Sequence, residues 1–451
     1  MMIVFKYRLS LFLLIFSMQL SFAQEDVANA KVWNLEDCIV YALEHSPTSK
    51  IQEYINDSYR LDKKSATASF FPSVGASVGA GFNFGRSIDP ATNAYNTVST
   101  FNNSYSLSTS VPVFSGLSLI YELRKSKINL LLRQSEQERV EDELVILVME
   151  VYIDILCYKG LIELYEEKVE SSNQLLQNTA KYVDLGLKSK ADLYEIKAQL
   201  AADEYGLIQN ENFYTTAVLR LKNSINFPTT EPLVIDTNYI RMIRAREENL
   251  LLKEIVAKAM EYNPTSRAYA VREDISKLNY KIAKGSLFPS ITFSAGASTN
   301  FFENMSIAYD VSPFHTQFLD NRGAYASFGL SIPVFSGLYR QSNVKRAKNN
   351  YMIAQQERID VLKDLEYAVN KAVLDKKACE QELVQMQDRT KTEELAQHFA
   401  LKKYDEGLLS SIDLQISSNR LLLSKANLLR ARLTLILKDR LVSYYSGSGL
   451  Y

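Results

Sequence analysis

The hexapeptide Pro-Val-Phe-Ser-Gly-Leu occupies residues 112–117 and occurs again, unchanged, at residues 333–338. Shorter matches lie around it in the same order and at nearly the same offset. They pair Glu44–Ser49 with Glu261–Ser266, Phe71–Ser73 with Phe288–Ser290, and Gly186-Leu187 with Gly407-Leu408. Self-similarity at a fixed offset indicates a tandem repeat. The sequence therefore predicts a first repeat within residues 24–227, a linker at 228–248, a second repeat at 249–446 and a tail at 447–451.

The N-terminal residues 1–23 have the pattern of a secretory signal peptide. Lys6 and Arg8 precede an apolar run over 9–16, and small residues stand before a cleavage point at Gln24. The competing interpretation is an anchoring transmembrane helix, but such a helix needs about 20 apolar residues. The sequence therefore predicts export of the mature chain.

Around the hexapeptide, each repeat contains two segments in which apolar residues alternate with glycine, serine or other polar residues. The expected strands are about 73–84, 104–113, 290–301 and 323–334. Strands of about ten residues cross a bilayer when tilted, with an apolar face toward lipid and a polar face toward water. The alternative is a soluble, half-buried hairpin; four such strands and an export signal favour a membrane barrel. The polar segments 85–103 and 302–322 are then expected as loops outside the cell.

The rest of each repeat has helical periodicity. Helices expected at 34–69 and 249–286 end at a Phe-Pro pair, which a helix does not easily continue through. Long proline-free helices over about 117–185 and 338–405 are followed by return helices over about 188–226 and 409–444. Such lengths indicate coiled-coil hairpins, about 117–226 and 338–444, rather than a compact domain.

Four strands cannot close a barrel, and open strand edges cannot face lipid. A chain of this kind must therefore pair its strands with those of neighbouring copies. Three chains would supply twelve strands, which lies within the known range for barrels, but the residues alone leave the number of chains open.

Composition and motifs give no sign of catalysis. The three histidines, His45, His315 and His398, lack partners at metal-ligand spacing, so no metal or cofactor is expected. The net charge of −1, with basic and acidic residues interleaved, does not suggest nucleic acid. Cys38, Cys157 and Cys379 lie in helical patterns and are interpreted as small buried thiols. Aromatic residues near strand ends are interpreted as interfacial girdles, with core packing as the alternative: Phe71, Phe114, Phe288 and Phe335.

Taken together, these features resemble the TolC family of outer-membrane efflux proteins. The resemblance covers nearly the whole mature chain and rests on the duplication, the order of helices and strands, the Phe-Pro entry to the first strand and the hexapeptide after the second. It implies a trimeric, twelve-stranded β-barrel with four strands per chain, continued by a long α-helical coiled-coil barrel in the periplasm. It also implies a non-catalytic duct for efflux or type I secretion. Its implied partners are a periplasmic adaptor, an inner-membrane pump of the RND or ABC type, and outer-membrane lipid.

The resemblance also implies roles for residues at the two hairpin tips. Gly186-Leu187 and Gly407-Leu408 resemble the segments that meet the adaptor. Asp192 and Tyr404 resemble gate residues, and Asp413 resembles an acid that rings the tunnel constriction. Three copies of such an acid around one axis would favour cations over anions.

Two positions depart from the family pattern. Leu409 stands where the best-known member has a gate arginine, and Ile416 stands where it has a second ring acid. The latch is therefore expected to differ, with Lys188 or Lys190 as candidates. Asp192 and Asp413 have a simpler interpretation too, as helix caps, since aspartate is a preferred N-cap residue.

A different class of function also fits part of the pattern. A structural or adhesive coiled-coil protein on the cell surface would use the long hairpins but would have no membrane-spanning strands. The duct remains the favoured hypothesis because of the alternating segments. The cargo cannot be inferred from the sequence.

Overall fold

The computed structural model describes residues 31–88, 93–237, 251–305 and 312–448. The expected signal peptide at 1–23 lies outside these residues. The chain divides into two compact units. One, here called the sheet unit, comprises Tyr54–Ser135 and Arg267–Val361. The other, the hairpin unit, comprises the segment up to Glu53 together with Glu136–Ser266 and Leu362–Tyr451.

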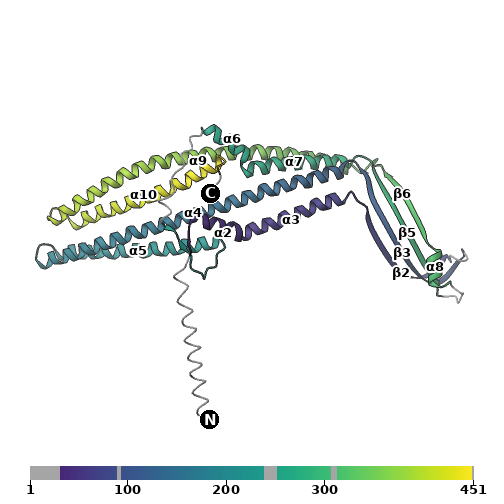
Figure 1. The fold of residues 1–451 in the computed structure, drawn as a ribbon, viewed down its shortest axis with the longest axis horizontal. Helices are drawn as coiled ribbons and strands as arrows, with labels where there is room; N and C mark the ends of the chain where they lie inside the picture. The colour runs from purple at the N-terminus through teal and green to yellow at the C-terminus, as the bar shows by residue number, and fades with distance from the viewer. Residues whose placement is uncertain (1–30, 89–92, 238–250, 306–311, 449–451) are drawn as a thin grey trace, which may run out of the picture. The chain divides into compact units, whose positions relative to one another are not determined.

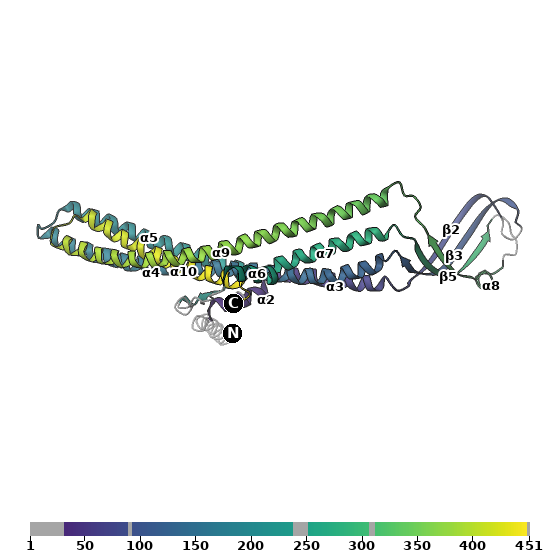
Figure 2. The same cartoon turned by 90° about the horizontal axis from the view of Figure 1, so that it is seen from above.

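The sheet unit contains four antiparallel strands in the order β2-β3-β5-β6 (Figure 1), and Figure 2 shows the same sheet from above. Their bounds are Ser73–Ile88, Tyr95–Ser115, Ser290–Asn304 and Gly323–Ser331. The register places most of the apolar residues of the four strands on one face. This apolar face carries Val74, Ala76, Val78, Phe82, Leu107, Ile291, Phe293, Ala297, Phe328 and Leu330. The opposite face carries serines and glycines, and Ser77 and Ser106 hydrogen-bond across it at 2.7 Å.

Three of the four strands extend further than the alternation predicted, and one loop expectation was wrong. β3 begins at Tyr95, so most of the expected loop 85–103 is strand, paired out to Ile88↔Tyr95. The main-chain ladder continues there because hydrogen bonding does not depend on the apolar pattern. The expected loop 302–322 contains a short helix, α8 (Phe314–Asp320). β6 ends at Ser331, three residues before its expected end near 334.

Each helix before a strand pair is broken in two, whereas a single helix was expected at 34–69 and at 249–286. The observed helices are α2 (Leu35–His45), α3 (Pro47–Ala68), α6 (Leu252–Tyr262) and α7 (Pro264–Gly285). The residues before the two prolines, Ser46 and Asn263, are extended, with ψ of 127° and 129°. A proline ring disfavours helical geometry in the preceding residue, so each proline starts a new helix.

Two helical hairpins form most of the hairpin unit. Their helices are α4 (Ser118–Asp184) with α5 (Lys190–Ser224), and α9 (Tyr339–Asp405) with α10 (Ser411–Tyr445). The first helix of each hairpin has 67 residues and the second has 35. In this unit the α4–α5 pair lies beside the α9–α10 pair (Figure 1).

No helix in the described ranges is both long enough and apolar enough to cross a membrane.

The hairpin unit has one large apolar core, here called the base core. Val145, Met149 and Tyr152 of α4 pack in it with Leu221 of α5 and Leu433 of α10. Helix α2 and a two-stranded parallel sheet, β1 (Val32–Trp33) and β4 (Val234–Ile235), cover it. β4 lies inside the expected linker 228–248. The Tyr152 hydroxyl donates to the Asp236 carbonyl oxygen at 2.8 Å, so the core tyrosine also fixes this segment.

The three cysteines are free thiols. Cys38 is fully buried in the base core, and burial raises the pKa of its thiol to about 12. Cys157 and Cys379 are only partly buried, so the expectation of buried thiols is met in full by Cys38 alone.

Candidate functional site at the hairpin tips

Both hairpins end in the same turn. The Leu187 amide donates to the Tyr182 carbonyl, and the Leu408 amide donates to the Lys403 carbonyl, each at 2.8 Å. Gly186 and Gly407 have φ of +73° and +76°, the left-handed conformation that ends a helix in this motif. The leucine side chains after them are 68% and 72% exposed. Each tip therefore presents an apolar side chain on a turn of defined geometry.

The two return helices begin with serine caps rather than with aspartate caps. Ser189 and Ser410 are the N-cap residues, and each hydroxyl accepts the amide of the aspartate three residues later, Asp192 or Asp413, at 3.1 Å. The aspartates are thus not the N-cap residues, but Asp192 does take part in capping, because its carboxylate accepts the Ser189 backbone amide in a capping box. They stand at the third helical position, where a carboxylate completes a capping arrangement and interacts favourably with the helix dipole.

Tyr404 lies in a small apolar cluster just behind the tips. It is 1% exposed and packs with Ile196 and Leu414. Its hydroxyl hydrogen-bonds the Thr179 hydroxyl at 3.1 Å, which joins the second hairpin to the first. Burial raises the pKa of the Tyr404 phenol because the charged form would lose its hydration. Leu409, at the position where an arginine was expected from the resemblance, packs against the same cluster.

Leu409 carries no charge, unlike the arginine expected at its position. Lys188 places a cation at the same interface, against Tyr404. Its Nζ lies 3.4 Å from the centroid of the Tyr404 ring and donates to the Tyr404 carbonyl oxygen at 3.0 Å. A lysine over an aromatic face is attracted by the ring quadrupole. Of the two candidate lysines, Lys188 therefore bridges the hairpins, whereas Lys190 is exposed and shows no such contact within the described ranges.

A second bridge joins Asp192 to the opposite tip. The Ser411 hydroxyl is 1% exposed, lies 3.0 Å from Asp192 Oδ1 and also contacts Glu195 Oε2. Hydrogen bonds from Ser189, and further ones from Ser411, hold the pKa of Asp192 below its ordinary value of 3.8. The structure thus brings Asp192 and Tyr404 to one interface between the hairpins. Asp413 is exposed, and its carboxylate accepts from Ser410 on its own helix.

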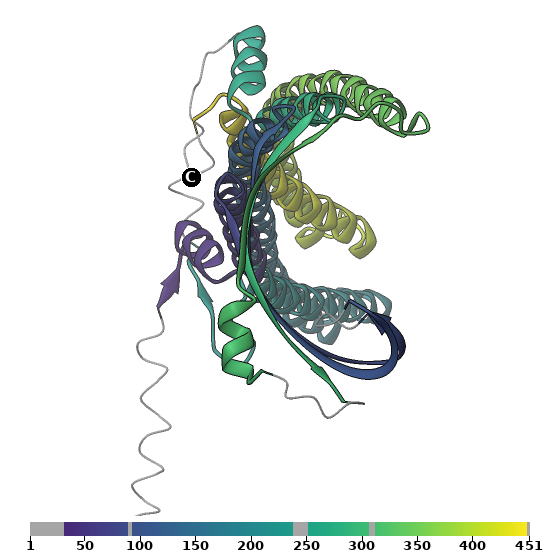
Figure 3. The same cartoon turned by 90° about the vertical axis from the view of Figure 1, so that its right-hand side faces the viewer.

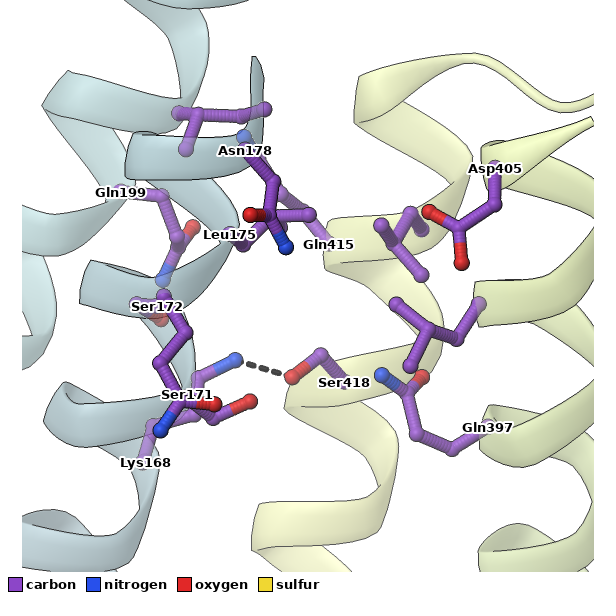
Figure 4. A pocket seen from close by; sticks show the side chains of 14 residues that line it. Lys168, Ser171, Ser172, Leu175, Asn178, Gln199, Gln397, Asp405, Gln415 and Ser418 are labelled. Carbon is purple, nitrogen blue, oxygen red and sulfur yellow. Dashed lines mark hydrogen bonds between the residues drawn. The ribbon is translucent and has the colours of Figure 1, made fainter. Parts of the chain in front are cut away.

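Further from the tips, the two hairpins enclose a polar pocket of about 150 Å³ (Figure 4). The Lys168 ammonium of α4 donates to the Ser418 hydroxyl of α10, as the dashed line shows. Asp203 of α5 lies 3.9 Å from the same ammonium and accepts from Ser172 and Gln199 at 2.6 and 2.7 Å. Both charged side chains are less than a tenth exposed.

Burial lowers the pKa of the Lys168 ammonium, although the charge of Asp203 opposes this shift. No pattern in the sequence predicted this pocket. Its charged residues have the spacing of an ordinary solvated helix face, and no local pattern marks a lysine whose partner serine lies 250 positions away. No group of three or more metal-ligating side chains occurs in the described ranges.

Residues 39–226 and 255–438 match the model of the family described as outer membrane efflux protein. The outer membrane protein TolC of Vibrio cholerae is 22% identical over 247 residues, which are 54% of this chain and 52% of that protein. The chain thus spans about half the length of this curated relative.

Two solved structures have the same fold. A structure of CusC superposes with a TM-score of 0.80 at 15% identity, covering 92% of each chain. The outer membrane protein VceC from Vibrio cholerae superposes with a TM-score of 0.76 at 15% identity, covering 92% of this chain and 97% of that one.

Proposed function

The chain belongs to the outer membrane efflux protein family, and from this premise we propose that it forms a trimeric exit duct across the periplasm and the outer membrane. Family membership places it in the outer membrane with its helical part in the periplasm, as a passive channel and not an enzyme. In the proposal, an inner-membrane pump of the RND or ABC type supplies the driving force through a periplasmic adaptor. Both tripartite efflux and type I secretion fit this arrangement.

The observation that carries the proposal is the four-stranded sheet with one exposed apolar face. Val78 and Phe328 on this face are 70% and 73% exposed. β2 and β6 are the edge strands, each paired on one side only among the described residues. An exposed apolar face of this kind is unfavourable in water, so lipid must cover it. Open strand edges are unfavourable in lipid, so further strands must pair with them. Strands from two further copies would complete a barrel of twelve.

The aromatic side chains near the strand ends fit the same proposal. Phe71, Phe288 and Phe335 are 66%, 59% and 78% exposed, and Phe114 is 37% exposed. Such exposure argues against core packing. It suits a girdle at a membrane interface, where aromatic rings are enriched.

We further infer that the hairpin tips form the gate. The duct is closed when Lys188 covers Tyr404 and Ser411 contacts Asp192, because these contacts hold the second hairpin against the first. Opening breaks them. Asp413, exposed near the tip of the second hairpin, would form the acidic ring of the constriction, which selects for cations.

The exposed tip leucines, Leu187 and Leu408, are the proposed contact for the adaptor. They are apolar, they stand on glycine turns of defined geometry, and they have the exposure that a partner surface requires. No observation favours the adhesive coiled-coil alternative.

The duct is tested with purified protein in planar lipid bilayers. We expect a complex three times the mass of the chain on gels run without boiling, together with discrete conductance steps. A monomer that leaves the bilayer resistance unchanged would refute the proposal.

The gate is tested with Lys188→Met, which keeps the length of the side chain but removes its charge. The lost cation–π contact and hydrogen bond are worth about 1–2 kcal/mol. We therefore expect the open fraction at rest to rise about tenfold, measured as single-channel open probability. The matched control is Lys190→Met, which should behave like the unsubstituted protein. Equal open probabilities for both variants would exclude Lys188 as the latch.

A further inference from the structure

Helix α8 packs on the apolar face of the sheet, although it belongs to a segment expected to be a loop outside the cell. Phe314 and Phe318 contact the Tyr105 ring, with centroids 6.1 and 5.3 Å away. The Thr299 hydroxyl donates to the Phe318 carbonyl oxygen at 2.8 Å. Figure 3 shows α8 beside the convex side of the curved sheet. The helix therefore lies on the side that faces lipid in the proposed barrel, on which this inference rests.

The side chain of Gln317 anchors α8 to the free edge of β5. Its amide nitrogen donates to the Phe302 carbonyl at 3.0 Å, and its amide oxygen accepts the Phe302 amide at 3.1 Å. β6 pairs with β5 only as far as Ser298. Beyond Ser298, the Gln317 side chain makes the backbone hydrogen bonds at Phe302 that a neighbouring strand would otherwise make. These bonds hold α8 against the sheet.

The position of α8 along the sheet corresponds to the outer membrane surface. Thr299 lies about nine residues along β5 from Ser290, where the strand leaves α7. At about 3.3 Å per residue and a tilt of about 40°, this is roughly 23 Å along the membrane normal. The apolar band of such barrels is about 25 Å tall. Helix α8 therefore lies at the boundary between acyl chains and headgroups of the outer leaflet.

A groove of about 500 Å³ runs between α8 and the sheet. Most of the exposed surface of its lining is apolar, and Val78, Leu107, Ala297, Phe318 and Ala324 belong to the lining. The apolar surface of this groove, open toward lipid, suits an acyl chain.

Arg322 is the one cation among the described residues that line the groove. Its Nε donates to the Leu319 carbonyl at 2.6 Å, which fixes the guanidinium. The structure shows no ion pair for Arg322 within the described part of the chain. Its remaining N–H donors suit a phosphate, which guanidinium groups bind through paired hydrogen bonds.

We propose that the groove beside α8 binds an acyl chain of phosphorylated lipid A, the glycolipid of the outer leaflet, with the lipid phosphate on Arg322. The apolar groove and Arg322 lie side by side at the outer membrane surface. The ligand must therefore carry an acyl chain and a phosphate close together at that surface, as lipid A does. The bound lipid would cover the part of the apolar face between α8 and β6.

The test measures binding of purified bis-phosphorylated lipid A to the delipidated trimer by native mass spectrometry. Ala324→Trp fills the groove and should weaken binding by at least about tenfold. Arg322→Gln removes the charge-assisted contact and should weaken it about tenfold. The matched control, Ala326→Trp, changes the same face of β6 outside the groove and should bind like the unsubstituted trimer.

Two further probes separate lipid sources. Dephosphorylated lipid A and phosphatidylglycerol should each bind about tenfold more weakly than lipid A. Equal binding of phosphatidylglycerol, or equal binding of lipid A to all three variants, would overturn the proposal. The same preparations are tested for conductance. If they conduct normally but bind lipid A and phosphatidylglycerol equally, the lipid site is refuted and the proposed duct is not. A protein that does not conduct refutes the duct itself.

Discussion

The two hairpins contact each other in two regions that differ in how much of the contact is apolar. At the base core, Leu433 of α10 is 1% exposed and packs with Val145, Met149 and Tyr152 of α4. Toward the tips, only a small apolar cluster of three buried side chains joins the hairpins. Polar contacts lie around it: Lys168 with Ser418, Thr179 with Tyr404, and Ser411 with Asp192. The character changes where Gly160 of α4 allows Leu429 of α10 to approach so closely that an added Cβ would lie 2.5 Å from a leucine methyl.

This difference separates a fixed region from one that can open. When an apolar core is pulled apart, its side chains are exposed to water. Water then makes no favourable contact that replaces the packing and burial that were lost. Hydroxyl, lysine and carboxylate contacts are exchanged for bonds to water at a small net cost. A gate motion would therefore separate the tips and leave the base core together, with the pivot near Gly160 and Leu429.

The largest effect should come from weakening the base core. Leu433→Ala removes a fully buried side chain and should lower the free energy of unfolding by about 2–5 kcal/mol. Chemical denaturation followed by the fluorescence of Trp33, the only tryptophan, measures it. Leu433→Met nearly conserves volume and should cost less than about 1.5 kcal/mol. If the alanine variant were as stable as the methionine variant, the core would not be the fixed region.

A smaller effect is expected from the tip hydroxyl. Tyr404→Phe keeps the ring under Lys188 but removes the hydrogen bond to Thr179, worth about 0.5–1.5 kcal/mol. The open probability should rise about two- to tenfold, and the unfolding midpoint should stay close to that of the unsubstituted protein. A large loss of stability with no change in open probability would show that the tips belong to the fixed part of the hairpins and not to the part that opens.

The smallest effect should be a pH dependence that is confined to the tips. The pKa of Asp192 in the folded chain lies below its ordinary 3.8. The hydrogen bond from Ser411, which joins the two hairpins, supplies part of this lowering. It therefore stabilises the closed tips above pH 3.8, and its contribution is lost as the pH falls through the lowered pKa. Open probability should therefore change little between about pH 7 and about pH 5 and should rise as the pH falls further, toward about pH 3. In Asp192→Asn this rise should be reduced, and an unchanged rise would exclude Asp192 as its source.

Much of the fold follows from local patterns. Period-two alternation located all four strands, and the absence of proline located α4 and α9 to within a residue of their observed ends. The breaks before Pro47 and Pro264 were missed because the apolar helical pattern continues through them, although the proline rule itself predicts both. Gly186 and Gly407 marked the tips correctly because the turn requires a positive φ.

The site was predictable only in part. The sequence itself determined the duplicated units, the alternating strands, the long hairpins and their glycine turns, because each depends on residues close together in the chain. Tertiary structure alone decided that Lys188 covers Tyr404, that Lys168 is buried against Asp203, and that α8 packs on the apolar face of the sheet. The first contact joins residues 216 positions apart. A contact between distant segments depends on how helices and strands pack, and no local periodicity encodes which side chains will then meet.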